Sequence, residues 1–254
     1  MSSSYARRVS RDRDFTAVGR ALAVPARSTI CNLLMDGSRR PAGELARLAG
    51  VSASTASDHL GVLVAAGLLR CHVRGRHRFY AIGGPEVGAA LEALGMVVAP
   101  APVSGFRGNR RAEHLAAARF CYDHLAGTLG TALTGVWLAD GWLDDPDALV
   151  LTPRGAAGFR DLGVRVDAAV AGRRATTRAC LDWTERRPHL GGAVGAAVGA
   201  RFLDAGWVVR HRSGRGLTVT PAGEALLEES FGVDLREQGC TGADVGRAAP
   251  ARVV

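Results

Sequence analysis

The chain has 254 residues, of which 47% are hydrophobic and 22% charged, which excludes a disordered protein and allows one large domain or two ordinary ones. Its net charge of +8 and its isoelectric point of about 10.2 favour a polyanionic partner such as double-stranded DNA. No apolar run approaches the roughly 20 residues that span a bilayer, and a polar N-terminus without a signal-peptide core predicts a cytoplasmic protein with no membrane partner.

Residues 1–14 are predicted to form a basic arm, and residues 15–98 a winged helix-turn-helix domain. Helical spacing of apolar residues runs from Phe15 to Leu34, with Pro25 between two pieces, and shorter helices follow over 41–49 and about 54–66. A two-stranded ribbon is expected from Leu68 to Ala81, turning at 74–76. Pro85 begins a last helix, whose expected apolar face consists of Val87, Leu91, Leu94 and Val98.

The helices over 41–49 and 54–66 have the geometry of a helix-turn-helix, whose second helix enters the major groove. Gly50 permits the turn, and Ser52 or Ser54 can cap the second helix. Arginines cluster around Gly75 at the tip of the ribbon, which suits phosphates or the minor groove. The residues predicted to contact DNA are Ser52, Ser54, Thr55, Ser57, Asp58, His59, Arg74, Arg76 and Arg78.

Residues 15–95 resemble the ArsR/SmtB family of small bacterial repressors. The matching segments are 21–27, 30–37, 44–46, 52–60 and 63–69, followed by the Arg-Gly-Arg wing with Phe79-Tyr80. The resemblance implies a homodimer, joined through its first and last helices, that binds a near-palindromic operator and releases it when an effector arrives. Asp58 stands where the family usually has a basic residue, so this helix departs from the family's pattern at that position. The family's metal sites are absent, because 43–49 has no cysteine and 85–98 no histidine.

Residues 99–111 are predicted to be a linker, 112–235 a duplicated sensor or dimerisation domain, and 236–254 a flexible tail. The repeats cover about 112–160 and 172–235. Each contains a Cys-x-Asp element, a helix ending in a Gly-Trp turn, a short strand, a loop, a second strand and Thr-Pro-x-Gly. This order resembles the back half of a winged helix used twice, which we expect to pack about a pseudo-twofold axis. The predicted fold class is therefore mainly α with small β-wings (α+β).

The effector or redox candidates of the duplicated domain are Cys121, Asp123, His124, Cys180, Asp182, Trp183 and His189. Cys121 and His124, three residues apart, are expected to share a helix face, and Trp183 is expected to take the position of His124 in the second repeat. If the cysteines and histidines converge, they suit zinc or haem iron. The alternatives are a buried structural core, for which no cofactor is expected, and a redox pair of Cys121 with Cys180.

We therefore expect a sequence-specific DNA-binding transcriptional regulator, a repressor released from its operator by a small-molecule or redox effector sensed in the C-terminal half. One alternative is an architectural DNA-binding dimer without an effector. Another is an enzyme with Cys121 as nucleophile and His124 as base. No oxyanion-hole signature accompanies that pair, so we expect no enzyme and no catalytic residue.

Overall fold

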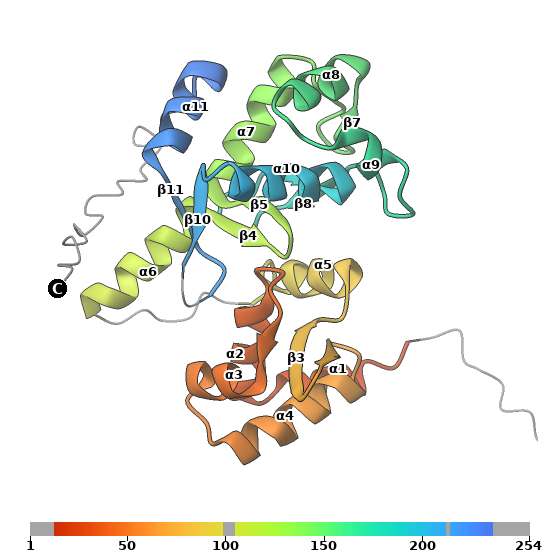
Figure 1. The fold of residues 1–254 in the computed structure, drawn as a ribbon, viewed down its shortest axis with the longest axis vertical. Helices are drawn as coiled ribbons and strands as arrows, with labels where there is room; N and C mark the ends of the chain where they lie inside the picture. Colours follow the sequence, from red (N-terminus) through yellow and green to blue (C-terminus); the bar gives the residue numbers. More distant parts are fainter. Residues whose placement is uncertain (1–12, 99–104, 212–213, 236–254) are drawn as a thin grey trace, which may run out of the picture. The chain divides into compact units, whose positions relative to one another are not determined.

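The computed structural model describes residues 13–98, 105–211 and 214–235 (Figure 1). These residues form two compact units. The first contains the chain up to Cys31 together with Arg40–Gly83, and the second contains Asn32–Arg39 and the chain from Gly84 onward. Nearly all of the predicted basic arm, the first part of the predicted linker, the predicted tail and Cys240 lie outside the described residues.

The first unit is a helix-turn-helix followed by a β-wing. Its elements are α1 (Thr16–Leu22), α2 (Pro25–Leu34, which runs into the second unit), β1 (Arg40–Pro41), α3 (Ala42–Ala49), α4 (Ala53–Ala65), β2 (Leu69–Arg74) and β3 (His77–Ile82). The strands form one antiparallel sheet in the order β1-β3-β2. The prediction of two helical pieces around Pro25, a helix pair and a ribbon is confirmed.

The second unit contains α5 (Pro85–Leu94), α6 (Gly105–Ala117) and two copies of a hairpin–helix–hairpin–helix motif. The first copy consists of β4 (Arg119–Cys121), β5 (His124–Ala126), α7 (Gly127–Ala139), β6 (Leu143–Asp144), β7 (Val150–Leu151) and α8 (Pro153–Asp161). The short α9 (Val166–Val170) precedes the second copy, which consists of β8 (Arg178–Leu181), β9 (Pro188–Gly191), α10 (Gly192–Asp204), β10 (Val208–Arg210), β11 (Leu217–Val219) and α11 (Pro221–Phe231). The predicted duplication is therefore visible in the fold.

The two copies exchange contacts, because α7 packs against β9 and α10 packs against β5. Glycines face the histidine of the other copy at equivalent positions of the two helices. A Cβ built on Gly130 of α7 would lie 3.5 Å from the Cβ of His189, and one built on Gly195 of α10 would lie 3.4 Å from the Cβ of His124. Such reciprocal packing is what a pseudo-twofold relation between the copies requires.

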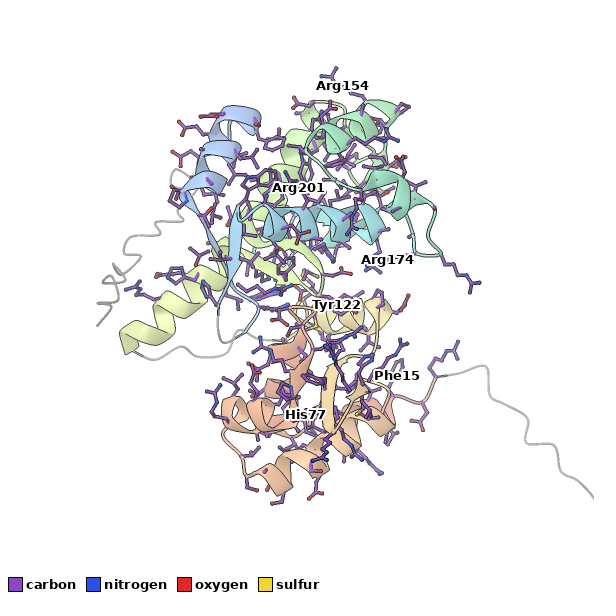
Figure 2. All side chains as sticks on the ribbon, in the orientation of Figure 1. Phe15, His77, Tyr122, Arg154, Arg174 and Arg201 are labelled. Carbon is purple, nitrogen blue, oxygen red and sulfur yellow. The ribbon has the colours of Figure 1, made fainter. Side chains whose placement is uncertain are left out.

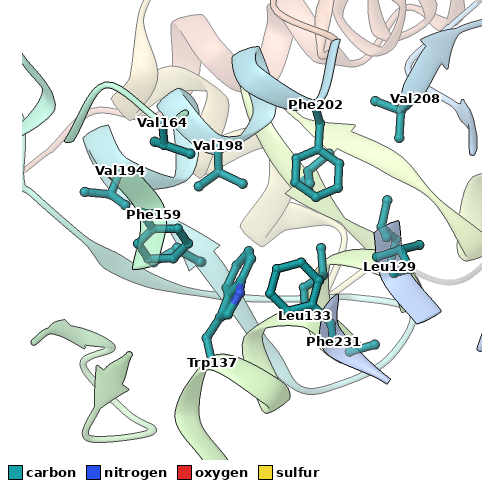
Figure 3. Close-up of a cluster of buried hydrophobic side chains, with 14 of the residues drawn as sticks. Leu129, Leu133, Trp137, Phe159, Val164, Val194, Val198, Phe202, Val208 and Phe231 are labelled. Atoms are coloured by element: carbon teal, nitrogen blue, oxygen red, sulfur yellow. The ribbon is translucent and has the colours of Figure 1, made fainter. Parts of the chain in front are cut away.

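Each copy closes in the same way at its Thr-Pro-x-Gly segment. The hydroxyl of Thr152 accepts the backbone N–H of Gly155 at 2.9 Å, and that of Thr220 accepts the N–H of Gly223 at 3.1 Å, so each threonine caps the last helix of its copy. The core between the copies is aromatic and aliphatic (Figure 3), with Trp137 edge-on to Phe159 at a centroid distance of 4.9 Å.

Two boundaries differ from the prediction. Helix α6 begins at Gly105, so the C-terminal part of the predicted linker 99–111 is helical. Helix α5 belongs to the second unit, although it was expected to complete the winged-helix domain 15–98.

The expected apolar face of α5 is wrong at Leu94 and Val98, although Val87 and Leu91 are partly buried. Leu94 and Val98 are 41% and 61% exposed, whereas Gly88 and Glu92 are buried. Gly88 faces inward because the Tyr122 ring packs on it, and a Cβ there would lie 2.8 Å from the ring. Glu92 faces inward because it finds cationic partners in the second unit.

Candidate functional site

The predicted DNA-reading helix α4 begins with a well-defined cap. Gly50 ends α3 in the left-handed region with φ 68°, and Ser52 then caps α4 by accepting the N–H of Thr55 at 3.1 Å. The hydroxyl of Ser54 lies 2.9 Å from that of Ser52. Of the six predicted DNA contacts on this segment, five are exposed and His59 is partly buried. Their contacts with DNA stay predictions.

The wing is an antiparallel hairpin in which Arg74 pairs with His77, and Gly75 turns the chain with φ 61°. Arg74, Arg76 and Arg78 are exposed, as is His77, which is labelled in Figure 2. No carboxylate among the described residues forms an ion pair with Arg74 or Arg76, so their charges are available to phosphates.

Cys121 and His124 do not share a helix face, contrary to the prediction. They end β4 and begin β5, and they are register partners across a two-residue turn of Tyr122 and Asp123. Tyr122 has φ 64°, a strained value for a residue with a side chain, and its N–H donates to the carbonyl of Met35 at 2.8 Å. The three-residue spacing fits a tight hairpin as well as a helix, and every residue of both strands is buried, so no alternating pattern reveals the strands.

The second copy repeats this hairpin with a longer loop. Cys180 on β8 is the register partner of His189 on β9, and residues 182–187 separate the two strands. His189, and not Trp183, is therefore the equivalent of His124. The prediction for Trp183 is wrong because the loop insertion shifts the frame, and Trp183 lies within that insertion.

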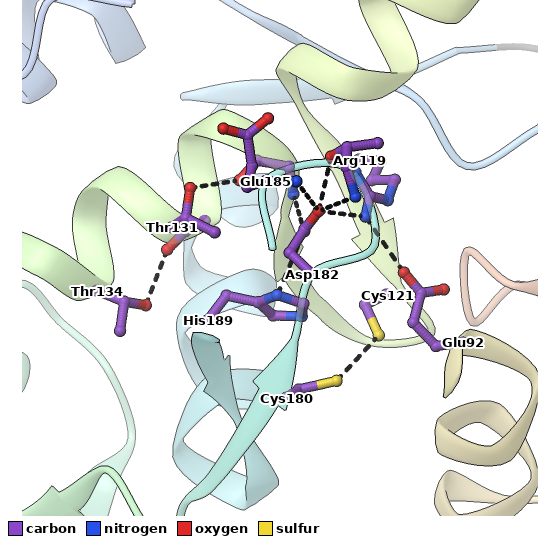
Figure 4. Close-up of polar contacts among 12 residues, drawn as sticks. Glu92, Arg119, Cys121, Thr131, Thr134, Cys180, Asp182, Glu185 and His189 are labelled. Carbon is purple, nitrogen blue, oxygen red and sulfur yellow. Dashed lines mark hydrogen bonds and ion pairs between the residues drawn. The ribbon is translucent and has the colours of Figure 1, made fainter. Parts of the chain in front are cut away.

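The two hairpins bring four potential ligands together. One ligand atom from each of Cys121, His124, Cys180 and His189 lies within 4.8 Å of the other three. The two Sγ atoms are 3.7 Å apart, and Figure 4 shows the contact between them. Cys121, His124 and His189 are at most 2% exposed, and Cys180 is partly buried. We call these four residues the Cys–His cluster.

Each histidine of the Cys–His cluster has a carboxylate beside its Nδ1 atom. His124 Nδ1 lies 3.1 Å from Asp123, and Asp123 in turn accepts two hydrogen bonds from Arg174. His189 Nδ1 lies 3.3 Å from Asp182 Oδ2, an ion-pair distance without hydrogen-bond geometry. The Nε2 atoms of both histidines are buried and have no hydrogen-bond partner among the described residues, an unusual arrangement for polar atoms.

The electrostatics of the cluster favour one thiolate. The hydrogen bond between the sulfurs lowers the pKa of Cys180 well below its usual value, against the effect of burial, and contacts with His124 and His189 lower it further. The same hydrogen bond raises the pKa of Cys121, and burial adds to that increase. Burial opposes protonation of His189, but Asp182 and Cys180 outweigh it and raise the pKa of the imidazole.

Asp182 connects the Cys–His cluster to a buried ion network. It accepts hydrogen bonds from Arg119 at 2.9 Å and from the backbone N–H of Gly127 at 2.7 Å. His189, Arg119 and Thr184 hold the pKa of Asp182 far below the usual range although burial opposes ionisation. Arg119 is fully buried and also donates to Glu92 of α5 at 3.3 Å. Arg215 forms a second ion pair with Glu92.

Trp183 covers this network, since the Arg119 guanidinium lies 4.6 Å from the centre of its ring. The sequence patterns did not point to Glu92, Arg119, Arg174 or Arg215. The signal for Arg119 was present, because an Arg-x-Cys-x-Asp string begins at Arg119 and again at Arg178.

The cluster can hold a metal ion or form a disulfide with little movement, because two thiols and two imidazoles face one another. It is poorly suited to nucleophilic catalysis through Cys121. That thiol is 1% exposed and has a raised pKa, whereas a catalytic cysteine needs an accessible thiolate.

A helix-turn-helix whose recognition helix and cationic wing are exposed defines a winged-helix DNA-binding protein. A family model described as a helix-turn-helix domain matches residues 22–72. The uncharacterized HTH-type transcriptional regulator YdfF of Bacillus subtilis is 37% identical over 215 residues, which cover 84% of this chain and 95% of YdfF. The chain belongs to the ArsR family of winged helix-turn-helix transcriptional regulators and is a DNA-binding regulator.

Other matches are shorter. The HTH-type transcriptional regulator CmtR of Mycobacterium bovis is 38% identical over 88 residues, covering 35% of this chain and 74% of CmtR. The solved structure of HlyU from Vibrio cholerae is 30% identical, covers 32% of this chain and 87% of its own, and has a TM-score of 0.30. The match to YdfF is long enough to include much of the duplicated half as well. In the described part of the chain, no helix has both the length and the apolar character needed to cross a bilayer.

Proposed function

We propose that this protein is a cytoplasmic, homodimeric repressor that binds one operator sequence and releases it when its C-terminal half senses an effector at the Cys–His cluster. The winged helix supplies the DNA contacts, and the duplicated half supplies the response. No catalytic step is part of this function, and no catalytic residue is assigned.

The position of α5 carries the proposal. Only Gly83 and Gly84 separate the end of β3 from Pro85 of α5, so the wing strand continues directly into this helix. Glu92 on α5 is nevertheless buried among Arg119 and Arg215 of the second unit. Because Arg119 also donates to Asp182 beside the Cys–His cluster, a change of bonding at the cluster reaches a helix that is continuous with the wing.

Exposed apolar side chains at the end of α5 support the homodimer that the family resemblance implies. Leu94, Val97 and Val98 are 41%, 77% and 61% exposed. A second copy of the chain would remove this apolar surface from water. Sedimentation equilibrium should therefore give the mass of two chains, and V97D/V98D should give the mass of one. A wild-type protein that sediments as a single chain at micromolar concentration would contradict the dimer.

Operator binding is tested by fluorescence anisotropy with a duplex from the protein's own upstream region and a random duplex of equal length and composition. At about 0.15 M salt, the specific duplex should bind at least roughly 10³-fold more tightly. Equal affinities would refute operator recognition and leave an architectural role.

Sensing is tested in the same titration by changing only the state of the Cys–His cluster. If thiol chemistry is the signal, mild oxidation should weaken operator binding by the wild type and leave operator binding by C121S/C180S unaffected. If a metal ion is the signal, loading the wild type with metal should change its operator affinity. Identical operator affinity in the reduced, oxidised and metal-loaded states would refute an effector role for the cluster.

A further inference from the structure

We propose that Cys121, His124, Cys180 and His189 bind one Zn²⁺-class cation in a closed tetrahedral site that joins the two repeats. This ligand set differs from the metal sites of the family, because it lies in the duplicated half and uses no residue of the winged helix.

The spacing of the sulfurs fits such an ion. A tetrahedral zinc site with Zn–S bonds of about 2.3 Å has an S···S edge of about 3.8 Å. The Sγ atoms of Cys121 and Cys180 are 3.7 Å apart, and the candidate ligand atoms of all four residues lie within 4.8 Å of one another. That spread suits a single ion and leaves no room for a porphyrin between the ligands, so haem does not fit.

The histidines are oriented for coordination. Asp123 and Asp182 sit at the Nδ1 atoms of His124 and His189, which leaves both Nε2 atoms for an ion. Those Nε2 atoms are buried without a hydrogen-bond partner among the residues described, and a metal bond would satisfy them. A carboxylate behind each coordinating imidazole is the usual second layer of a zinc site.

The two carboxylates beside the histidines are themselves held by hydrogen bonds. Arg174 holds Asp123 through two hydrogen bonds, and Arg119 together with the N–H of Gly127 holds Asp182. The carboxylates thus have fixed positions before any ion arrives, which reduces the entropy lost on binding.

The chemistry of the four ligands selects the ion. Two thiolates and two imidazoles, with no carboxylate in the inner layer, disfavour Mg²⁺ and Ca²⁺ and favour Zn²⁺. Four protein ligands leave no open position, so the ion would be structural or regulatory. Binding requires both sulfurs as thiolates and both imidazoles in the neutral form, so every proton that these ligands carry beyond those forms is released to solvent, and no electron is transferred.

The ion would tie β4–β5 of the first repeat to β8–β9 of the second. Metal binding as such is independent of the proposed function, whereas its use as a signal rests on that function. Loading would change the bonding of His189, which lies beside Asp182 and hence beside the Arg119–Glu92 network.

The test is a Co²⁺ titration of the full-length protein, reduced and freed of metal by a chelator. One equivalent should give the intense visible bands of tetrahedral Co²⁺ with thiolate charge transfer, and Zn²⁺ should bleach them. C121S/C180S and H124Q/H189Q should lose these bands, whereas C71S, which removes an exposed cysteine of the wing, should bind like the wild type. Far-UV circular dichroism checks that each variant is folded.

A positioning variant and a protection assay keep the proposal testable if a ligand variant unfolds. D123N should weaken Co²⁺ binding about 10–100-fold while the bands remain tetrahedral. Zn²⁺ should also protect Cys180 of the wild type from alkylation. Absence of both Co²⁺ bands and Zn²⁺ protection, or a Cys121–Cys180 disulfide in protein purified anaerobically, would overturn the metal site. Tight metal binding without any change in operator affinity would instead refute the sensing role and leave the site standing.

Discussion

Replacing Asp182 by asparagine should destabilise the second unit strongly. Every group that hydrogen-bonds to the Asp182 carboxylate is a donor, namely the Arg119 guanidinium, the backbone N–H groups of Gly127, Thr184 and Glu185, and the Thr184 hydroxyl. An amide has one oxygen and one NH₂ group. In any rotamer, D182N therefore turns a donor toward donors and removes the negative charge that faces Arg119.

The magnitude follows from burial. Asp182 and Arg119 side chains are both 0% exposed, so solvent cannot replace the lost partner. Among the described residues, Glu92 is then the one anionic partner left to Arg119, and Arg215 already pairs with Glu92. Removing one member of a buried ion pair costs about 3–5 kcal/mol, which is the loss in unfolding free energy that we expect.

Chemical denaturation followed by tryptophan fluorescence measures this loss, with chelator and reductant present to exclude metal and disulfide effects. All four tryptophans, Trp137, Trp142, Trp183 and Trp207, belong to the second unit, so the signal reports that unit alone. D167N is the matched control, because Asp167 forms an exposed pair with Arg160 and its loss should leave the midpoint nearly unchanged. A D182N variant within about 1 kcal/mol of the wild type would refute the reasoning from buried charge.

Three further outcomes follow from single sites. R74A should weaken binding to every duplex and reduce the slope of log affinity against log salt by roughly one, measured by anisotropy at several salt concentrations; an unchanged slope would place Arg74 away from phosphate. G130A should destabilise the second unit, because its Cβ would lie 2.5 Å from a backbone oxygen, whereas G135A on the same helix, 3.4 Å from the mobile end of an arginine, should stabilise by up to about 1 kcal/mol. The tryptophan assay compares them, and equal stabilities would contradict the packing. Iodoacetamide should modify exposed Cys71 well before Cys31, whose pKa burial raises to about 12; mass spectrometry follows both, and equal rates would show that Cys31 is accessible.

The winged helix could be predicted because its signals are local. Gly50 supplies a left-handed helix end, Ser52 caps the next helix, and Gly75 permits the tight turn of the wing. Each of these residues acts on backbone that lies within a few positions of it in the sequence. A single sequence therefore contains nearly all the information that fixes the helix-turn-helix and the ribbon.

The residues of the Cys–His cluster could be predicted from the sequence, but their arrangement could not. The repeated Cys-x-Asp strings showed which residue types were duplicated, but a spacing of three fits both a helix and a two-residue hairpin turn. The strand register shows that His189 is the equivalent of His124. Counting residues from each cysteine does not reveal this equivalence, because the loop after Cys180 is longer than the loop after Cys121. The convergence of the two hairpins depends on the long-range packing of α7 against β9 and of α10 against β5, which no local pattern encodes.

Helix α5 shows why the boundary between the two halves was misplaced. Its apolar residues have helical spacing, so the pattern assigns the inward face to them, yet the buried face contains Glu92. A buried glutamate is costly unless it is paired, and its partners Arg119 and Arg215 are distant in sequence. That pairing makes α5 part of the second unit while the chain still connects it directly to the wing. Under the proposed function, an effector that draws Asp182 or Arg119 toward the Cys–His cluster would change the balance of charge around Glu92, and α5 is the element that would respond.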